Sequence, residues 1–171
     1  MIKKIYLDMD GVLCDFHKRY QELFGYKPGG EGRENERDRK EFSSNWKHFV
    51  ETDQFESLDW FAGGKDLIDF VTKTPHFTPV EILSSSGGIR NHSEVRDQKV
   101  RWLKTHGIDF PANIVPGRKV KKFFAMKGNV LIDDTEDVID AFNEAGGIGI
   151  LHKDVDKTVN RLKELLYYDQ Y

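Results

Sequence analysis

Two pairs of aspartates in this sequence each follow a run of apolar residues. Asp8 and Asp10 end the first run near the start of the chain, and Asp133 and Asp134 end the second. If both runs are buried strands, four carboxylates meet at one place and repel one another strongly unless a cation lies between them. Because Mg²⁺ prefers oxygen ligands, the four aspartates predict a Mg²⁺ site in which one carboxylate is free to do chemistry.

The spacing of Asp8 and Asp10 suits phosphoryl transfer through a covalent aspartyl phosphate. A carboxylate is a weak nucleophile, but it suffices beside a cation and a phosphate whose charge is neutralised. The second acid can protonate the leaving oxygen and then deprotonate the hydrolytic water. Gly11 allows a tight turn in which backbone N–H groups face the phosphate. The competing interpretation is that Asp-Met-Asp-Gly is only a turn at a strand end.

Hydroxyl and basic side chains that could bind a phosphate lie between the two aspartate pairs. Ser84 and Ser85 follow another apolar run, and hydroxyl and amide groups at a strand end can bind phosphate oxygens without adding charge. A basic cluster at residues 118–122 precedes the second aspartate pair, and one of its lysines could neutralise phosphate charge. Taken alone, the serines also fit an ordinary loop, and the cluster fits a solvated helix start.

The elements that must position these residues alternate between strands and helices from residue 63 to the C-terminus. Such alternation indicates an α/β fold with a parallel sheet covered by helices on both faces. In such sheets ligands bind outside the carboxyl ends of the strands, where the acids lie. We expect strands at residues 80–83, 113–115, 130–132 and 148–151, and helices at 91–106, 119–126, 136–145 and 155–166.

A segment of about sixty residues between the first two core strands breaks this alternation, which is too long for a simple connection. It holds an expected helix at residues 16–24, further helical pieces rich in aromatic residues, and a charged run at 31–41 that fits a solvated loop or helix face. We predict that residues 15–77 form a small helical cap over the site. The core domain would then comprise residues 1–14 and 78–171.

The composition bounds the class of protein. The chain has 171 residues, enough for one core domain and a modest insertion, and its net charge of -3 gives no basic field for stable nucleic-acid binding. The single cysteine, Cys14, cannot form an internal disulfide, and no apolar run approaches the ~20 residues that cross a bilayer. We expect a soluble cytoplasmic protein without membrane contact; the sequence leaves open whether it forms a homodimer.

The order of these motifs resembles the haloacid dehalogenase (HAD) superfamily of phosphotransferases over nearly the whole chain. The motifs are Asp8-x-Asp10-Gly11, Ser84 at a strand end, a lysine near 121 and Asp133-Asp134. The opening Asp-Met-Asp-Gly-Val-Leu-Cys-Asp-Phe is similar to that of the 5′(3′)-deoxyribonucleotidase family. Residues 55–64 resemble the cap exit of that family, and residues 131–134 and 146–151 resemble its small bacterial and viral members. The resemblance implies a Rossmann-like HAD core with a helical cap inserted after the first strand.

The resemblance implies roles for the four aspartates. Asp8 would be the nucleophile, and Asp10 would be the acid–base that also offers its backbone carbonyl to Mg²⁺. Asp134 would bind the metal, with Asp133 beside it in the second shell. All four acids are therefore expected around the Mg²⁺ site.

The resemblance also implies how the phosphate is held. Ser84, with Ser85 beside it, would bind the phosphate, and Lys121 would neutralise its charge. Lys119 or Lys122 could take that place, because the register of the basic cluster is open by a few residues. Serine stands at position 84 where the family more often has threonine, which keeps the hydroxyl.

The aromatic residues of the cap are candidates for a nucleobase pocket. Phe16, at the start of the cap, would stack on the base, and Trp60 is a further candidate. Trp46, Phe55 and Phe61 are weaker candidates, because such residues more often belong to a core. The charged run at residues 31–41 departs from the family pattern and leaves the specificity for base and sugar open.

The resulting hypothesis is a Mg²⁺-dependent phosphomonoester hydrolase. It would dephosphorylate deoxynucleoside or ribonucleoside monophosphates through a phosphate bound to Asp8, in nucleotide metabolism. One alternative is a phosphatase for a nucleic-acid 3′-phosphate end or a sugar phosphate. The other is a binding module that keeps the fold without the chemistry. The sequence does not distinguish deoxyribose from ribose, or a 5′ from a 3′ phosphate.

Overall fold

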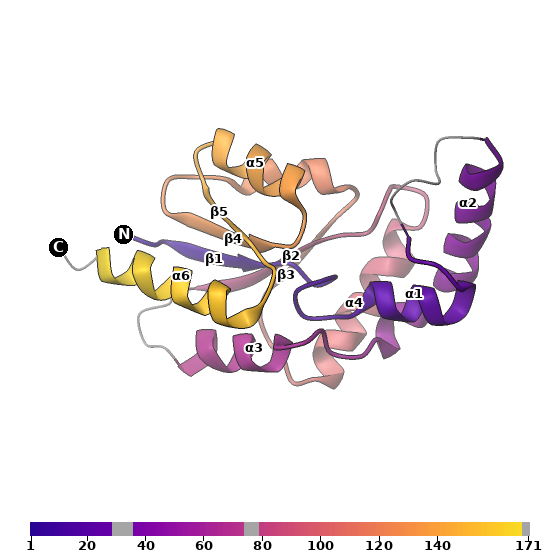
Figure 1. Ribbon diagram of the computed structural model, residues 1–171, viewed down its shortest axis with the longest axis horizontal. Coiled ribbons are helices and arrows are strands. Elements are labelled where there is room, and N and C mark those ends of the chain that lie inside the picture. Colours follow the sequence, from indigo (N-terminus) through magenta and orange to yellow (C-terminus); the bar gives the residue numbers. More distant parts are fainter. Residues whose placement is uncertain (29–35, 74–78, 169–171) are drawn as a thin grey trace.

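A five-stranded parallel sheet forms the centre of the protein, in the strand order β3-β2-β1-β4-β5 (Figure 1). The computed structural model describes residues 1–28, 36–73 and 79–168. The first strand lies in the middle, between the second and the fourth, and every pairing is parallel. The strands are β1 (Lys4–Leu7), β2 (Val80–Ser85), β3 (Ala112–Val115), β4 (Asn129–Asp133) and β5 (Ile148–Leu151).

Helices connect the strands at the places that the sequence pattern predicts, and the α/β fold class is confirmed. They are α1 (Phe16–Phe24), α2 (Glu36–Glu51), α3 (Gly64–Lys73), α4 (His92–Thr105), α5 (Glu136–Glu144) and α6 (Val155–Tyr168), with the 3-10 helices η1 (Gln54–Ser57) and η2 (Arg118–Phe124). The short helix expected at residues 119–126 is thus the 3-10 helix η2. Its tighter winding suits a short connector between two strands.

The two faces of the sheet carry separate sets of buried side chains, as the alternation along a strand requires. Ile5 and Leu7 pack into a cluster with residues of α3, α4 and α6. Tyr6 faces the other way and packs with residues of α5 and η2. Figure 1 shows the same layering, with α3 and α6 on one side of the sheet and α5 on the other.

Helices α1 and α2 lie beyond the carboxyl ends of the strands (Figure 1). The Asp15 side chain accepts a hydrogen bond from the Lys18 amide and caps the start of α1, and Gly25 ends the helix in a left-handed conformation. Tyr20, Phe49 and Phe55 are buried between these helices and η1. This aromatic packing holds α1, α2 and η1 together.

The predicted division of the chain into a cap and a core stays a prediction. Part of the segment at 15–77, including residues 31–35 of the charged run, lies outside the described residues. Helix α3, at the end of that segment, packs against α6 beside the sheet. None of the helices in the described part of the chain is both long and apolar enough to span a membrane.

We expect Leu7→Ala to lower the free energy of unfolding by about 2–5 kcal/mol, because it leaves a cavity in the central strand. Leu7 is fully buried, whereas Leu23 on α1 is 40% exposed and provides a matched control. Urea denaturation of both variants measures the difference. An equal loss at the two positions would contradict the assignment of β1 to the core.

Candidate active site

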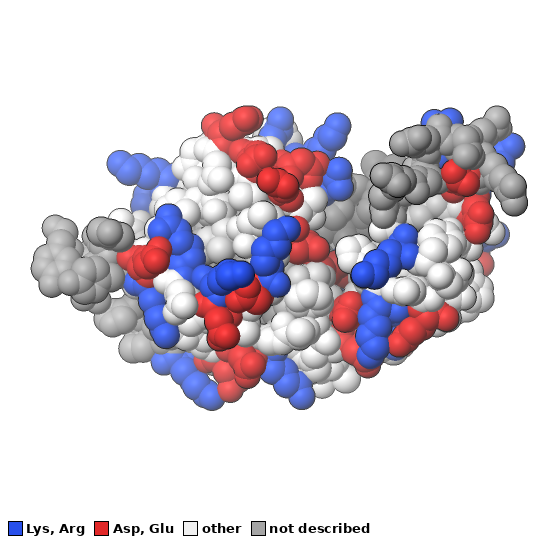
Figure 2. Space-filling view, in the orientation of Figure 1, with Lys and Arg blue, Asp and Glu red and all other residues white. Residues whose placement is uncertain are grey.

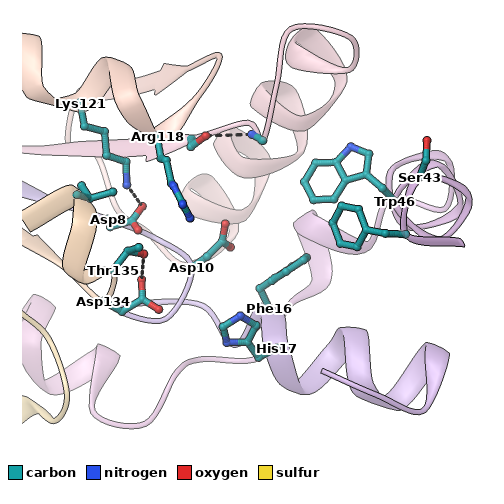
Figure 3. Close-up of a pocket in the computed structure, with 14 residues that line it drawn as sticks. Asp8, Asp10, Phe16, His17, Ser43, Trp46, Arg118, Lys121, Asp134 and Thr135 are labelled. Atoms are coloured by element: carbon teal, nitrogen blue, oxygen red, sulfur yellow. Dashed lines mark hydrogen bonds and ion pairs between the residues drawn. The ribbon is translucent and has the colours of Figure 1, made fainter. Parts of the chain in front are cut away.

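A cavity of about 530 Å³ opens at the carboxyl ends of β1, β2 and β4. Carboxylates and a lysine line one part of it, and aromatic side chains of α1 and α2 line another (Figure 3). The sequence-predicted residues that it brings together are Asp8, Asp10, Phe16, Ser85, Lys121 and Asp134. Its other lining residues are His17, Phe42, Ser43, Trp46, Gly87, Arg118, Thr135 and Val138.

Asp8 follows β1 directly and lies beside the end of β4, because its backbone N–H donates to the Ile132 carbonyl at 3.0 Å. The Met9 amide donates to Oδ1 of the carboxylate at 2.8 Å, and the Lys121 ammonium lies 3.0 Å from the same oxygen. No partner of Oδ2 is found among the described residues. The oxygen available to a reacting group is therefore Oδ2, held in orientation through its neighbour.

Lys121 joins the two neighbouring strand ends. Its ammonium lies 2.6 Å from Asp133 Oδ2, and the other Asp133 oxygen accepts the Thr135 amide at 2.9 Å. Burial disfavours the charged form of Lys121, but the Asp8 and Asp133 carboxylates outweigh it and raise the pKa of the ammonium. Burial, followed by repulsion from Asp8, raises the pKa of Asp133. Each Asp133 oxygen thus has a protein partner, and the carboxylate holds Lys121 in place.

The register of the basic cluster, which the sequence leaves open, is visible in the structure. The Lys121 side chain is buried and lines the cavity. Lys119 and Lys122 are exposed and line a separate, smaller cavity of about 210 Å³. The 3-10 winding of η2 turns these two lysines away from Asp8, so Lys121 is the member of the cluster in the site.

Asp134 lies over the backbone of Gly11. A β-carbon at Gly11 would come within 2.1 Å of Asp134 Oδ2, and Gly11 has a left-handed φ of 77°. Only glycine therefore allows this approach without strain. Burial, followed by repulsion from Asp8, Asp133 and Asp10, raises the pKa of the Asp134 carboxyl to about 7. No basic side chain is paired with Asp134 among the described residues.

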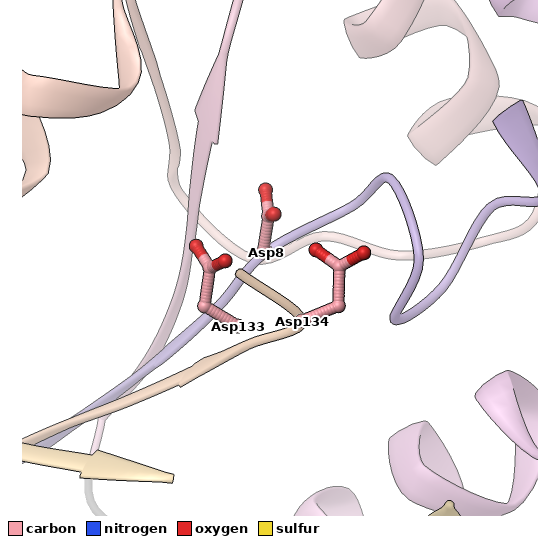
Figure 4. Close-up of side chains that lie close together, drawn as sticks. All are labelled: Asp8, Asp133 and Asp134. Carbon is pink, nitrogen blue, oxygen red and sulfur yellow. The ribbon is translucent and has the colours of Figure 1, made fainter. Parts of the chain in front are cut away.

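Three carboxylates form a cluster that fits a divalent cation. Asp8, Asp133 and Asp134 each offer one oxygen, and these oxygens lie within 4.8 Å of one another (Figure 4). Oxygen ligands of this kind, with water completing the shell, suit Mg²⁺. The raised pKa of Asp134 indicates negative charge in excess of what Lys121 balances, which a cation would compensate.

The Asp10 side chain is bound to a lysine that the sequence analysis missed. Lys99 on α4 is buried, and its ammonium lies 2.7 Å from Asp10 Oδ2 and 2.8 Å from both Ser84 Oγ and the Ser85 carbonyl. The Asp10 carboxylate thus lies apart from the three-carboxylate cluster. A signal was present in the sequence, because Lys99 lies on the same helical stripe as Val95 and Trp102, which are both buried.

The two predicted phosphate-binding serines differ in exposure. Ser85 lines the cavity, and its Oγ accepts the Gly87 amide at 3.0 Å. Ser84 is fully buried with its hydroxyl against Lys99. Successive side chains of a strand point to opposite faces, which explains why only one of the two reaches the cavity.

The aromatic part of the cavity comes from Phe16 on α1 and from Phe42 and Trp46 on α2. The ring of Trp46 lies against Gly87, where an added β-carbon would come within 2.7 Å of it. Helix α2 therefore touches the loop after β2. The structure does not bring Trp60 to this cavity, because its ring packs against Trp102 and His106 at 4.9 Å.

Phe55 and Phe61, two of the weaker candidates, also lie elsewhere. Phe55 is buried and stacks parallel to Phe16 at 5.7 Å, so it supports the cavity wall from behind. Phe61 packs edge-on against His152 at 5.9 Å. Neither is among the residues that line the cavity.

Comparison with protein families gives a match over almost the entire chain. The model of the family described as 5′ nucleotidase, deoxy (pyrimidine), cytosolic type C protein (NT5C) matches residues 1–164. No curated protein matches the chain by sequence.

Solved structures with the same fold have low sequence identity to the chain. A hydrolase from Streptococcus pneumoniae TIGR4 is 15% identical with a TM-score of 0.53, over 95% of this chain and 98% of that chain. The HAD hydrolase YfnB from Bacillus subtilis, solved bound to magnesium, is 13% identical with a TM-score of 0.52, over 90% of each chain. At this identity the similarity supports the fold alone.

We expect Mg²⁺ to stabilise the protein more at about pH 8 than at about pH 5.5, because metal binding requires ionised carboxylates. The pKa of Asp134 is about 7 in the folded protein against an ordinary value of 3.8. Between these values the folded state binds more protons than the unfolded chain, so without metal this group's contribution to stability falls as the pH rises. Bound Mg²⁺ should offset that fall.

Thermal unfolding with Mg²⁺ and with EDTA at both pH values measures the effect. Asp134→Asn should remove most of the Mg²⁺-dependent shift, whereas Asp140→Asn, an exposed aspartate on α5, should keep it. A shift that is the same at both pH values, or that survives in Asp134→Asn, would contradict a metal site at this carboxylate.

Proposed function

The chain belongs to the 5′ nucleotidase, deoxy (pyrimidine), cytosolic type C protein family of nucleotidase-like hydrolases, and we propose that it dephosphorylates nucleoside monophosphates through a phosphate bound to Asp8. The membership confirms the resemblance found in the sequence. The observation that carries the proposal is one cavity that joins Asp8, Asp10 and Lys121 to the aromatic residues Phe16 and Trp46. A phosphate suits the first part of the cavity and a flat nucleobase suits the second.

In the first step Asp8 Oδ2 attacks the phosphorus atom, and the bond between phosphorus and the nucleoside oxygen breaks. Asp10 enters this step as the carboxylic acid and gives its proton to that oxygen, so the nucleoside leaves as an alcohol. In the second step Asp10 takes a proton from a water molecule that attacks the phosphorus. The bond to Asp8 breaks, inorganic phosphate leaves, and both carboxylates return to their starting states.

The side chains around Asp8 support the charge changes of these steps. Lys121 lies at Oδ1 of the nucleophile, where it can neutralise an equatorial phosphate oxygen. The Ser85 side chain lines the same cavity and offers a neutral contact. We propose that Ser84, fully buried behind it, supports this phosphate site through its hydroxyl.

Mg²⁺ is the proposed cofactor, with Asp8 and Asp134 as its ligands and Asp133 beside them. When bound, it would balance the charge of the phosphate and of the acids. The three-carboxylate cluster supports this assignment. The Asp10 carboxylate is hydrogen-bonded to Lys99. Asp10 would therefore contribute only its backbone carbonyl to the metal.

The cavity favours a small substrate over a polynucleotide. Helices α1 and α2 lie over it, and we propose that residues 15–77 act as the cap that excludes water during the reaction. Basic and acidic residues are interspersed over the face shown in Figure 2, and the described residues form no broad basic surface on that face. The single cysteine supports the cytoplasm as the place of action.

Phosphate release from a panel of substrates tests the proposal. The panel contains deoxynucleoside and ribonucleoside 5′- and 3′-monophosphates, sugar phosphates and a 3′-phosphorylated oligonucleotide, each with Mg²⁺ or EDTA. We expect Mg²⁺-dependent release that is fastest with nucleoside monophosphates. Release confined to sugar phosphates or to the oligonucleotide would support the phosphatase reaction but overturn the proposal that nucleoside monophosphates are the substrates.

Asp8→Asn should abolish turnover, because the amide cannot act as the nucleophile, and it should leave the fold intact. Residual phosphate release at the wild-type rate would overturn the assignment of Asp8. Mass spectrometry of the wild-type protein quenched during turnover should detect one added phosphoryl group, which Asp8→Asn should lack. Circular dichroism and thermal unfolding control for folding.

Asp10→Asn should lower turnover of a nucleoside monophosphate by about 10²–10⁴-fold if Asp10 transfers the proton. Asp15→Asn, a change to the nearby N-cap residue of α1, is the matched control and should leave turnover within a few-fold. A loss below tenfold in Asp10→Asn would mean that solvent supplies the proton.

A further inference from the structure

We infer that Lys99 is a positioning residue, which holds the Asp10 carboxylate in the orientation that delivers a proton to the leaving oxygen. The inference rests on the proposed function, and it adds a residue on α4 to a site otherwise built at the ends of β1, β2 and β4. Its basis is the contacts of the Lys99 ammonium, the burial of its side chain and the lack, among the described residues, of another hydrogen-bond partner of the Asp10 carboxylate.

The Lys99 ammonium has three N–H donors and three acceptors close by. Asp10 Oδ2 lies at 2.7 Å, Ser84 Oγ at 2.8 Å and the Ser85 carbonyl at 2.8 Å. An ammonium group has no further donor to offer. Lys99 is also absent from the cavity lining, so it acts on the substrate through Asp10 rather than by direct contact.

The burial of Lys99 makes polar partners for its ammonium group necessary. The Lys99 side chain is only 1% exposed, against 29% for Asp10. A buried ammonium is costly unless it is paired and hydrogen-bonded. Among the described residues, Asp10 is the one carboxylate in an ion pair with it. The fold therefore brings Lys99 and Asp10 together from positions 89 residues apart.

Asp10 depends on the pair in turn. Its Oδ1 is buried and has no hydrogen-bond partner among the described residues. The bond from Lys99 to Oδ2 is thus the contact that fixes the rotation of the carboxylate. Without it, the carboxylate could turn away from the leaving oxygen, and a displacement of about 1 Å can cost a reaction about 10²-fold.

Residues of α2 and η1 secure Lys99 from the other side. The ammonium lies 5.3 Å from the centre of the Phe55 ring, a distance at which a cation is attracted to the ring face. The neighbouring Gln98 accepts a hydrogen bond from the Phe55 amide at 3.1 Å and donates to the Val50 carbonyl at 2.8 Å. Phe55 in turn stacks on Phe16, so the proton-transfer residue is linked to the aromatic wall of the cavity.

A comparison of two leaving groups distinguishes a positioning role of Lys99 from a purely structural one. A nucleoside oxygen is a poor leaving group and needs a proton, whereas p-nitrophenolate leaves readily without one. The parameter kcat/KM reports the steps up to departure of the leaving group. For Lys99→Met we expect a loss in kcat/KM of about 10²-fold with a deoxynucleoside monophosphate, and of less than about 5-fold with p-nitrophenyl phosphate.

A double-mutant comparison tests whether Lys99 acts through Asp10. In the Asp10→Asn background, adding Lys99→Met should lower kcat/KM for the nucleotide by less than about 3-fold, because the group that Lys99 positions is already lost. Lys104→Met is the matched control, since Lys104 is an exposed lysine on the same helix. It should leave kcat/KM unchanged for both substrates.

Thermal unfolding is measured for every variant. If Lys99→Met does not fold, Lys99→Gln replaces it, because glutamine is uncharged and keeps hydrogen-bond donors for Ser84 and Ser85. Equal losses with the two substrates, or multiplicative losses in the double variant, would overturn the positioning role. Activity confined to alkyl phosphates other than nucleotides would contradict the proposed substrate. The effect of Lys99→Met on kcat/KM could then still be compared between such an alkyl phosphate and p-nitrophenyl phosphate. A wild-type protein inactive on every phosphate ester would overturn both.

Discussion

The crowding of carboxylates at the ends of β1 and β4 is the constraint on which the site depends. Parallel pairing of these strands brings Asp8 beside Asp133, and the next residue adds Asp134. Such a group is stable only if positive charge lies within it. Lys121 supplies part of that charge by bridging Asp8 and Asp133, and the excess that remains at Asp134 is what makes the place suitable for a divalent cation.

A second lysine gives the two aspartates of the first motif different surroundings. Asp8 is buried beside Lys121 and the acids of β4, whereas Asp10 is partly exposed and paired with Lys99 from α4. Two carboxylates only two residues apart therefore meet different cations from different elements. This separation is what a mechanism with one nucleophile and one proton-transfer group requires, because the two acids must not compete for the same partner.

The aromatic residues of α1 and α2 complete the cavity without adding charge. Phe16 lies only a few residues after Asp10, and the tight turn at Gly11 allows the chain to pass directly from the acids into α1. Trp46 reaches the loop after β2 and touches Gly87. Helix α2 and the loop after β2 are thus in direct contact, so this side of the cavity is bounded by packing rather than by charge.

The sequence by itself determined the fold class and the convergence of the acids. Apolar runs that end in Asp8 and Asp133 are readable as buried strands, and parallel strands place their carboxyl ends at one edge of the sheet. Only the tertiary structure decided which lysine of the basic cluster enters the site, because the winding of η2 turns Lys121 inward and leaves Lys119 and Lys122 exposed. It also showed that Lys99 pairs with Asp10, and that Trp60 packs against Trp102 away from the cavity. Local patterns report which face of an element is apolar, whereas the partner of a buried charge lies far away in sequence and is fixed by how the elements pack.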